Sequence, residues 1–199
     1  TQTGYVLALH FHLTPMRERA VEELVRLIRE KGNHLTTGFV GTPYLCKTLS
    51  DNGYGELAYE LLLQKTYPSW LYSVTKGATT IWEHWDGIRE DGTFWSKDMN
   101  SFNHYAYGSI ADWLYETAAG IGQKEPGYRR ILIAPMPDKR LTHLSASIDT
   151  MYGEIASSWK EEGGKYVYHI RIPCNTQAEI RLPSGRVEHV GSGSYEFVE

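Results

Sequence analysis

A carboxylate between two tryptophans is the feature of this sequence best suited to chemistry. The segment Gly77–Gly87 reads GATTIWEHWDG and places Glu83 directly after Trp82 and two positions before Trp85. Aromatic walls exclude water, strengthen local electrostatics and let neighbouring groups set the pKa of a carboxyl group. Glu83 could therefore exchange protons with a substrate. The same residue also fits a solvated loop glutamate or a cap at a helix N-terminus.

A histidine follows in the segment Ser101–Tyr105, which reads SFNHY and opens a predicted helix. Ser101 or Asn103 could cap this helix. The positive end of a helix disfavours a protonated imidazole, so His104 would stay neutral near pH 7 and could hydrogen-bond a substrate hydroxyl. A structural histidine bonded to the backbone is the alternative.

The acidic residues around this segment do not predict a metal site. Their spacing fits neither a calcium loop nor a metal triad, so we interpret them as turn residues. They are Asp86, Glu90, Asp91 and Asp98. We predict neither a metal nor a cofactor.

Other classes of function are excluded by what the sequence lacks. It has no Gly-rich phosphate loop, Gly-x-Ser-x-Gly elbow or Cys/His nucleophile arrangement. With 20 Lys and Arg against 24 Asp and Glu, and without a basic run, we expect no nucleic acid partner. No apolar run approaches the roughly 18 residues that span a bilayer, so we expect no membrane partner. The 13% of aromatic residues fit either a large core or a cleft that stacks on sugar rings.

The elements that must position these residues begin with helices. Apolar residues at three- and four-residue spacing, Thr-Pro starts and Gly ends predict helices over about 14–31, 42–52, 57–66 and 105–119. Between the third and the fourth, Trp70–His104 has no clean period. A compact domain seldom carries so long an irregular connection unless it is functional.

After Tyr128 the apolar residues recur at every second position instead of every third or fourth. In Lys165–Ile172 the even positions are apolar, while His169 and Arg171 face the other way, which is typical of a half-buried strand. Similar strands are predicted over 155–160, 178–182, 187–190 and 195–198. Helices followed by strands predict an α+β chain in two parts, with an all-α domain over 1–128 and a small antiparallel β-sandwich over 129–199.

Two motifs in this order closely resemble the inverting α-L-rhamnosidase family of glycoside hydrolases. They are GATTIWEHWDG at 77–87 and SFNHYAYGSIADWLY at 101–115. The resemblance covers nearly the whole chain. It implies that the helices close an (α/α)6 six-hairpin barrel and that the strands form the family's C-terminal β-sandwich.

The same resemblance assigns roles to single residues. The Glu of the family's Thr-Thr-x-Trp-Glu motif is the general base, which falls on Glu83. The His of its Phe-Asn-His-Tyr motif contacts the rhamnose, which falls on His104. We add Trp82 and Trp85 as substrate-binding residues because they stand beside Glu83. The implied partner is a rhamnose-containing carbohydrate or glycoside.

The family's general acid belongs to an acidic motif further upstream, which this chain does not contain. Inversion requires two carboxyl groups about 6.5–9.5 Å apart, of which only the base is present here. We therefore expect a C-terminal fragment that is inactive alone, from an enzyme that hydrolyses terminal α-L-rhamnosides with inversion. The alternatives are a non-catalytic carbohydrate-binding or interaction module, and another α/α-barrel glycosidase.

A truncated barrel should also expose apolar surface. We expect the inward aromatic residues of 70–95 and the seam beside Leu24 and Ile28 to be uncovered. Because large exposed apolar patches are rare on monomers, the chain should self-associate through this face or keep Trp70–His104 mobile.

Overall fold

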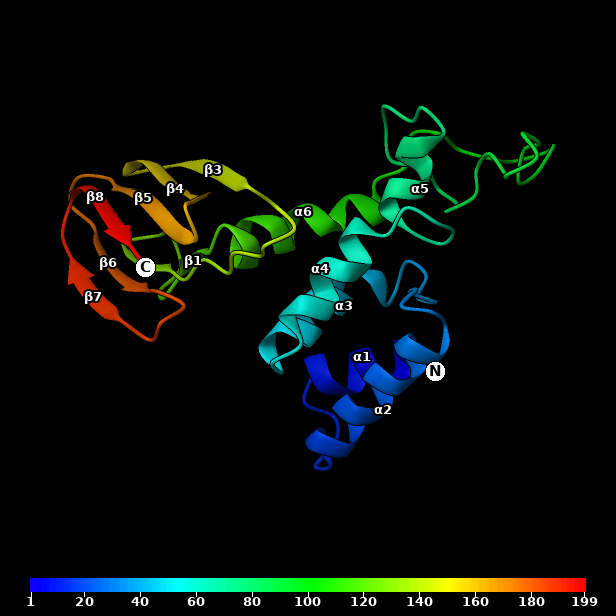
Figure 1. The fold of residues 1–199 in the computed structure, drawn as a ribbon, viewed down its shortest axis with the longest axis horizontal. Coiled ribbons are helices and arrows are strands. Elements are labelled where there is room, and N and C mark those ends of the chain that lie inside the picture. The colour runs from blue at the N-terminus through cyan, green and yellow to red at the C-terminus, as the bar shows by residue number, and fades with distance from the viewer. The chain divides into compact units, whose positions relative to one another are not determined.

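The structure is a computed structural model that describes all 199 residues. The chain divides into two compact units, Thr1–Ile110 and Ala111–Glu199, which we call the helical unit and the sheet unit. Figure 1 shows the helices from blue to green and the strands from green to red. The division falls earlier than the predicted boundary at 128/129. One reason is that the backbone of Thr117 and Ala118 bonds to Met136 and Trp159, which lie inside the sheet unit.

The helical unit contains five α-helices. They are α1 (Gln2–His10), α2 (Arg17–Glu30), α3 (Thr42–Asp51), α4 (Gly55–Leu63) and α5 (Trp70–Thr75). The predictions over 14–31, 42–52 and 57–66 are confirmed as α2, α3 and α4. The helix α1 was missed because its apolar residues do not form one stripe. The helix α5 has only six residues and depends on a cap, in which the Ser69 hydroxyl accepts the Tyr72 N–H at 3.1 Å.

The core of this unit lies where α1 packs against α2 and α3, and where α3 packs against α4. Leu24 and Ile28 are both 0% exposed, so the predicted uncovered seam beside them is wrong. The physical reason is α1, which packs against α2 within this same chain. Trp70 and Trp82 are also buried, whereas Trp95 is 41% exposed.

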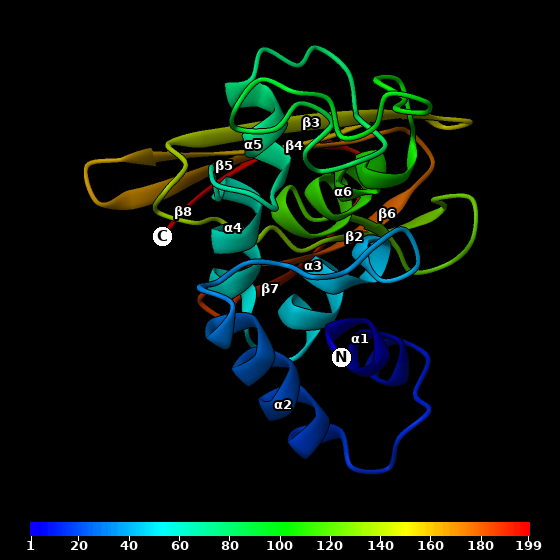
Figure 2. The same cartoon turned by 90° about the vertical axis from the view of Figure 1, so that its right-hand side faces the viewer.

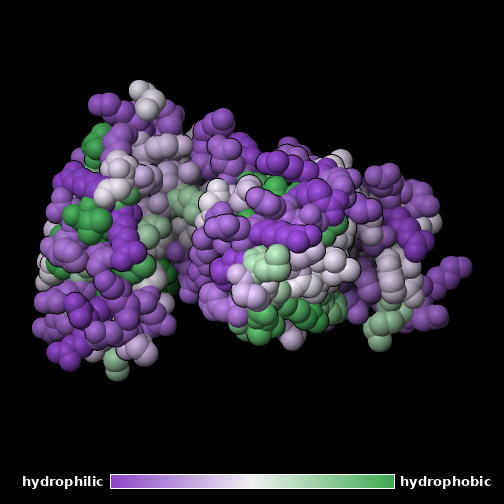
Figure 3. Space-filling view, turned by 90° about the horizontal axis from the view of Figure 1, so that it is seen from below, coloured by the Kyte–Doolittle hydropathy of each residue, from purple (hydrophilic) through white to green (hydrophobic).

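Hydrophobic side chains reach the surface in separate places. On the face shown in Figure 3 they appear as green patches among hydrophilic purple side chains. The most exposed large ones are Leu13, Val40, Met99, Tyr105 and Met151. Self-association stays a prediction.

None of the helices combines the length and the hydrophobicity needed to cross a bilayer.

The predicted helix over 105–119 forms as three consecutive helical turns of different pitch. They are a 3-10 turn η1 (Ala106–Ser109), an α-turn α6 (Ile110–Trp113) and a π-turn η2 (Leu114–Ala118). Gly120 ends this run with φ +77°, and a Cβ there would stand 2.2 Å from the carbonyl carbon of Ala134. Glycine is required at this position because any side chain would collide with the backbone beside it.

Eight strands build the sheet unit as two four-stranded sheets, of order β1-β2-β6-β7 and β3-β4-β5-β8. Their bounds are β1 (Ile121–Gln123), β2 (Arg130–Ile133), β3 (His143–Thr150), β4 (Gly153–Glu162), β5 (Lys165–Ile172), β6 (Gln177–Arg181), β7 (Val187–Val190) and β8 (Gly193–Val198). Figures 1 and 2 show β3, β4, β5 and β8 side by side. The two-part α+β organisation is confirmed. One pair, β2 with β6, is parallel and was not predicted, because the strands of the other sheet intervene in the chain.

The core of the sheet unit is apolar and aromatic. Tyr168, Ile170 and Ile172 of β5 are buried while His169 and Arg171 are exposed, as the alternation predicted. The largest buried side chain is Trp159, which is 1% exposed. Its indole N–H donates to the carbonyl of Ala118 at 2.9 Å. This bond fixes the end of η2 to the core of the sheet unit.

Candidate functional site

The long segment after α5 folds back on itself as an irregular ribbon. The Glu83 N–H donates to the Ser101 carbonyl at 2.9 Å, and the His104 N–H donates to the Ile81 carbonyl at 2.8 Å. The Thr80 hydroxyl also donates to the Phe102 carbonyl. Two antiparallel stretches, 80–83 and 101–104, are thus bonded through their backbones. Glu83 and His104, the two residues predicted to take part in chemistry, therefore lie on the same ribbon.

The Glu83 side chain has one oxygen fixed by the backbone. Its Oε2 accepts the Ser101 N–H at 3.1 Å. Its Oε1 lies 3.8 Å from Nε2 of His84, and the side chain is 22% exposed. A partly exposed carboxylate with one oxygen anchored keeps lone pairs for a further donor, such as a water molecule.

His104 is held by a backbone donor and by aromatic rings. Its Nδ1 accepts the Ala106 N–H at 3.2 Å. The ring stacks on Phe39, with centroids 4.8 Å apart, and on Tyr105, with centroids 5.4 Å apart. Since Nδ1 accepts a hydrogen bond, the neutral ring carries its proton on Nε2. His104 can therefore donate one hydrogen bond from Nε2 without a net charge.

Trp82 and Trp85 lie in aromatic surroundings of their own. Trp82 is edge-to-face with Phe102, whereas Trp85 stacks on Tyr107 at 3.7 Å and meets Trp70 edge-to-face. Both tryptophans line a cavity of about 320 Å³, together with Trp70, Leu71, Ser73, Val74, Ala78, Thr79, Thr80, Ile81, His84, Tyr107 and Ile110. Glu83 and His104 are not among its lining residues. Glu83 and His104 thus lie on one ribbon, whereas Trp82 and Trp85 line the cavity.

Two polar groups of this aromatic cluster bear on its chemistry. The indole nitrogen of Trp85 is buried and has no hydrogen-bond partner. Burial, with smaller contributions from Tyr67 and from the charge of Glu83, raises the pKa of Tyr107 to about 12. The phenol therefore stays neutral, while the buried indole N–H of Trp85 has no acceptor in this structure.

Sequence reasoning missed the residues that hold the two histidines. Phe39 stacks on His104, and Trp95 stacks on His84 with centroids 3.5 Å apart and planes at 11°. Local patterns carry no signal for either contact, because Phe39 is far from His104 in the chain and the segment that joins His84 to Trp95 has no regular period. The turn role predicted for Asp91 is visible, since its carboxylate accepts the N–H and the hydroxyl of Thr93. No group of three or more His, Cys, Asp or Glu residues is arranged to hold a metal ion.

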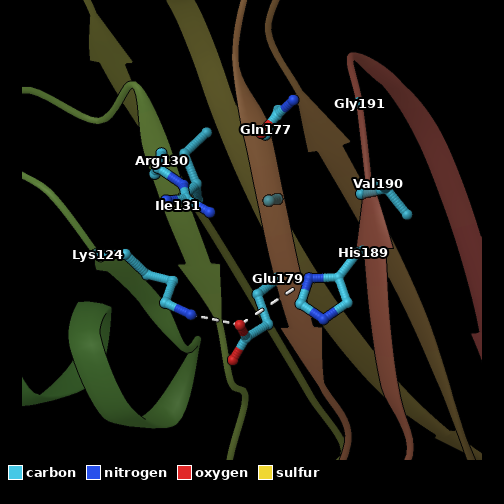
Figure 4. Close-up of a pocket in the computed structure, with 9 residues that line it drawn as sticks. Lys124, Arg130, Ile131, Gln177, Glu179, His189, Val190 and Gly191 are labelled. Carbon is cyan, nitrogen blue, oxygen red and sulfur yellow. Dashed lines mark hydrogen bonds and ion pairs between the residues drawn. The ribbon is translucent and has the colours of Figure 1, made fainter.

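A second hollow, of about 270 Å³, lies on the β1-β2-β6-β7 sheet (Figure 4). Lys124 and His189 point towards the carboxylate of Glu179, which is only 9% exposed. The Lys124 ammonium donates to this carboxylate, and the Arg181 Nε donates to it at 2.5 Å. Arg130 is paired with Glu125. The cations lining this hollow are matched by carboxylates, which indicates a structural network rather than a binding site.

The hydrogen bond from Lys124, followed by that from Arg181, lowers the pKa of Glu179. A lowered folded-state pKa adds stability above the unfolded-state value of about 4.3 and loses it as pH falls through the folded-state value. Glu179→Gln should therefore lower the melting temperature at neutral pH and flatten its decline in acid. Thermal unfolding of both proteins between about pH 7 and pH 3 measures this, with Glu125→Gln as the control. If the melting temperatures of Glu179→Gln and of the unaltered protein fall in parallel as the pH is lowered, the prediction is wrong.

Comparison with known proteins identifies the family. Residues 1–118 match the model of the bacterial alpha-L-rhamnosidase 6 hairpin glycosidase domain. Residues 120–196 match the model of the bacterial alpha-L-rhamnosidase C-terminal domain. The resemblance drawn from the motifs around Glu83 and His104 is therefore confirmed.

Relatives and solved structures agree with these matches. An alpha-L-rhamnosidase of Formosa agariphila is 46% identical over 199 residues, with 99% of this chain and 22% of the relative covered. One of Streptomyces avermitilis is 42% identical over 218 residues, with 99% of this chain and 21% of the relative covered. The chain thus spans about a fifth of the length of these curated relatives.

The crystal structure of the Streptomyces avermitilis alpha-L-rhamnosidase complexed with L-rhamnose superposes with a TM-score of 0.95 at 41% identity, covering 100% of this chain and 21% of that one. The native enzyme of Aspergillus terreus superposes with a TM-score of 0.96 at 39% identity, covering 100% of this chain and 24% of that one. Family models, relatives and folds all point the same way: the chain belongs to the bacterial α-L-rhamnosidase family, with a six-hairpin glycosidase portion over 1–118 and the C-terminal domain over 120–196.

Proposed function

We propose that the protein carrying this chain hydrolyses terminal α-L-rhamnosides with inversion, and that Glu83 is its general base. The observation that carries this proposal is the backbone-bonded ribbon that holds Glu83 and His104 together. The names of the relatives, and the L-rhamnose bound by the Streptomyces enzyme, support the choice of sugar.

In this mechanism Glu83 removes a proton from the attacking water. The water oxygen bonds to the anomeric carbon on the face opposite the leaving group, as the bond to the glycosidic oxygen breaks. That oxygen takes a proton from a general acid. The Ser101 N–H holds Oε2 of Glu83 throughout, so the carboxylate keeps its orientation as it accepts the water proton.

His104, Trp82 and Trp85 are the proposed contacts to the sugar. His104 would donate from Nε2 to a rhamnose hydroxyl, since its Nδ1 is engaged by Ala106. Trp82 and Trp85 would supply aromatic surface, since both line the same cavity. Aromatic faces suit the apolar faces of sugar rings.

The general acid is proposed to lie in a part of the protein outside these 199 residues. An inverting reaction needs a second carboxyl group on the other side of the scissile bond. In the family this group belongs to an upstream motif, and the chain spans about a fifth of its relatives. The chain by itself should therefore bind poorly and turn over no substrate.

A panel of aryl glycosides tests the proposal on the complete protein. We expect release of the aryl alcohol from the α-L-rhamnoside and not from the matching α-L-arabinoside or β-D-glucoside. Proton NMR during the first turnovers should show β-L-rhamnose before it mutarotates. Retention, or hydrolysis of another glycoside only, would contradict the proposal. Rhamnose binding without turnover would instead identify a non-catalytic module.

A further inference from the structure

We propose that His84 is a positioning residue for Glu83, which holds the carboxylate oxygen that the backbone leaves unbound. This inference rests on the proposed function. Oε2 of Glu83 is held by Ser101, whereas Oε1 faces Nε2 of His84 at 3.8 Å. The Ser101 N–H and Nε2 of His84 therefore face different oxygens of one carboxylate.

The His84 ring is itself held in place. It lies on Trp95 with centroids 3.5 Å apart and an interplanar angle of 11°. The Trp95 N–H donates to the Gly87 carbonyl at 3.2 Å, and Arg89 donates to the Trp95 carbonyl at 3.0 Å. A short turn, closed by the bridge between Ile88 and Phe94, thus carries Trp95 back onto His84.

His84 lies beside both Glu83 and the aromatic cavity. Its side chain is 25% exposed and lines the aromatic cavity that contains Trp82 and Trp85, whereas Glu83 does not line that cavity. The imidazole borders the cavity and can direct a donor towards Oε1 of Glu83. Such a donor restricts rotation of the carboxylate and leaves its remaining lone pairs for the water.

The 3.8 Å separation is longer than an ordinary hydrogen bond. Catalytic hydrogen bonds are often long in the free protein and shorten once substrate is bound. Another titratable group near the pair is Tyr107, which stays neutral, while Asp86, two positions after His84, faces Arg89 at 3.9 Å. A neutral His84 that donates from Nε2 is therefore sufficient for the role.

Two substitutions of His84 in the complete protein distinguish the contribution of its N–H donor from that of its aromatic ring. His84→Phe keeps an aromatic face on Trp95 but removes the donor. His84→Gln loses the ring but keeps an N–H on a side chain of similar reach. We expect His84→Phe to lower kcat for an aryl α-L-rhamnoside about tenfold with KM changed less than about twofold, which is the scale of one hydrogen bond made to a charged group. His84→Gln should recover most of this loss.

A control is His10→Phe, because His10 also packs against an aromatic ring, that of Tyr44, outside the 77–105 segment. It should leave kcat and KM unchanged. Thermal unfolding of each variant shows whether a loss of activity follows from a loss of folding.

The outcomes distinguish this inference from the proposed function. If the unaltered protein hydrolyses no rhamnoside, the proposed function fails. If it is active and His84→Phe keeps full kcat, the positioning role is wrong while the proposed function stands. Equal loss in His84→Phe and His84→Gln, or a change in KM alone, would also overturn the positioning role, because each points to the ring as a substrate contact.

Discussion

Replacing Glu83 with Gln in the complete protein should lower kcat for an aryl α-L-rhamnoside at least about a hundredfold, because general base catalysis contributes roughly 10²- to 10⁴-fold. The amide keeps the size of the side chain and can still accept the Ser101 N–H through its oxygen. It cannot take the proton of the attacking water. Steady-state kinetics should therefore show a large loss in kcat and a small change in KM.

Azide provides the positive control for this variant. It needs no base, so it can attack the anomeric carbon of the rhamnoside in the Glu83→Gln protein while the general acid still protonates the leaving oxygen. We expect azide to restore aryl alcohol release, with β-L-rhamnosyl azide as the product. Unchanged turnover in Glu83→Gln would remove this residue from the role of base. Loss of activity without azide rescue would point to a damaged site instead.

Replacing Trp159 with Ala should destabilise the sheet unit by about 3–5 kcal/mol, the usual cost of deleting a large buried aromatic side chain. Trp159 is 1% exposed, and its removal leaves a cavity between the sheets. It also leaves the carbonyl of Ala118 without the indole donor. Amide hydrogen exchange of β4 and β5 in the complete protein measures the change as a lower free energy of opening.

Two further variants make this result specific. Trp159→Phe refills part of the cavity but lacks the indole N–H, so its loss of stability should be intermediate. Val198→Ala, at a half-exposed site on β8, should change the free energy of opening by less than about 0.5 kcal/mol. Unchanged exchange in Trp159→Ala would mean that this side chain does not hold the two sheets together.

Local patterns in the sequence determined the regular elements whose own residues carry a period. The apolar stripe of α2 places Ala20, Val21, Leu24, Val25 and Ile28 in the core. The alternation of β5 buries Tyr168, Ile170 and Ile172. Both are short-range consequences of helix and strand geometry, which need no knowledge of the partner.

The sequence also predicted candidate site residues, from their types and from the resemblance to a known family. Glu83 and His104 were predicted from two motifs, and the structure places both on one backbone-bonded ribbon. Their roles in catalysis stay predictions. Trp82 and Trp85 were chosen as neighbours of Glu83, but they line a cavity to which Glu83 does not contribute.

Only the tertiary structure decided the contacts between distant segments. The stacking of Phe39 on His104, the parallel pairing of β2 with β6, and the burial of Leu24 and Ile28 within this chain are all of this kind. The physical reason is that periodicity and turn chemistry act over a few residues, whereas these contacts form when whole elements pack. Which face meets which partner depends on the summed burial and hydrogen bonding of the folded chain.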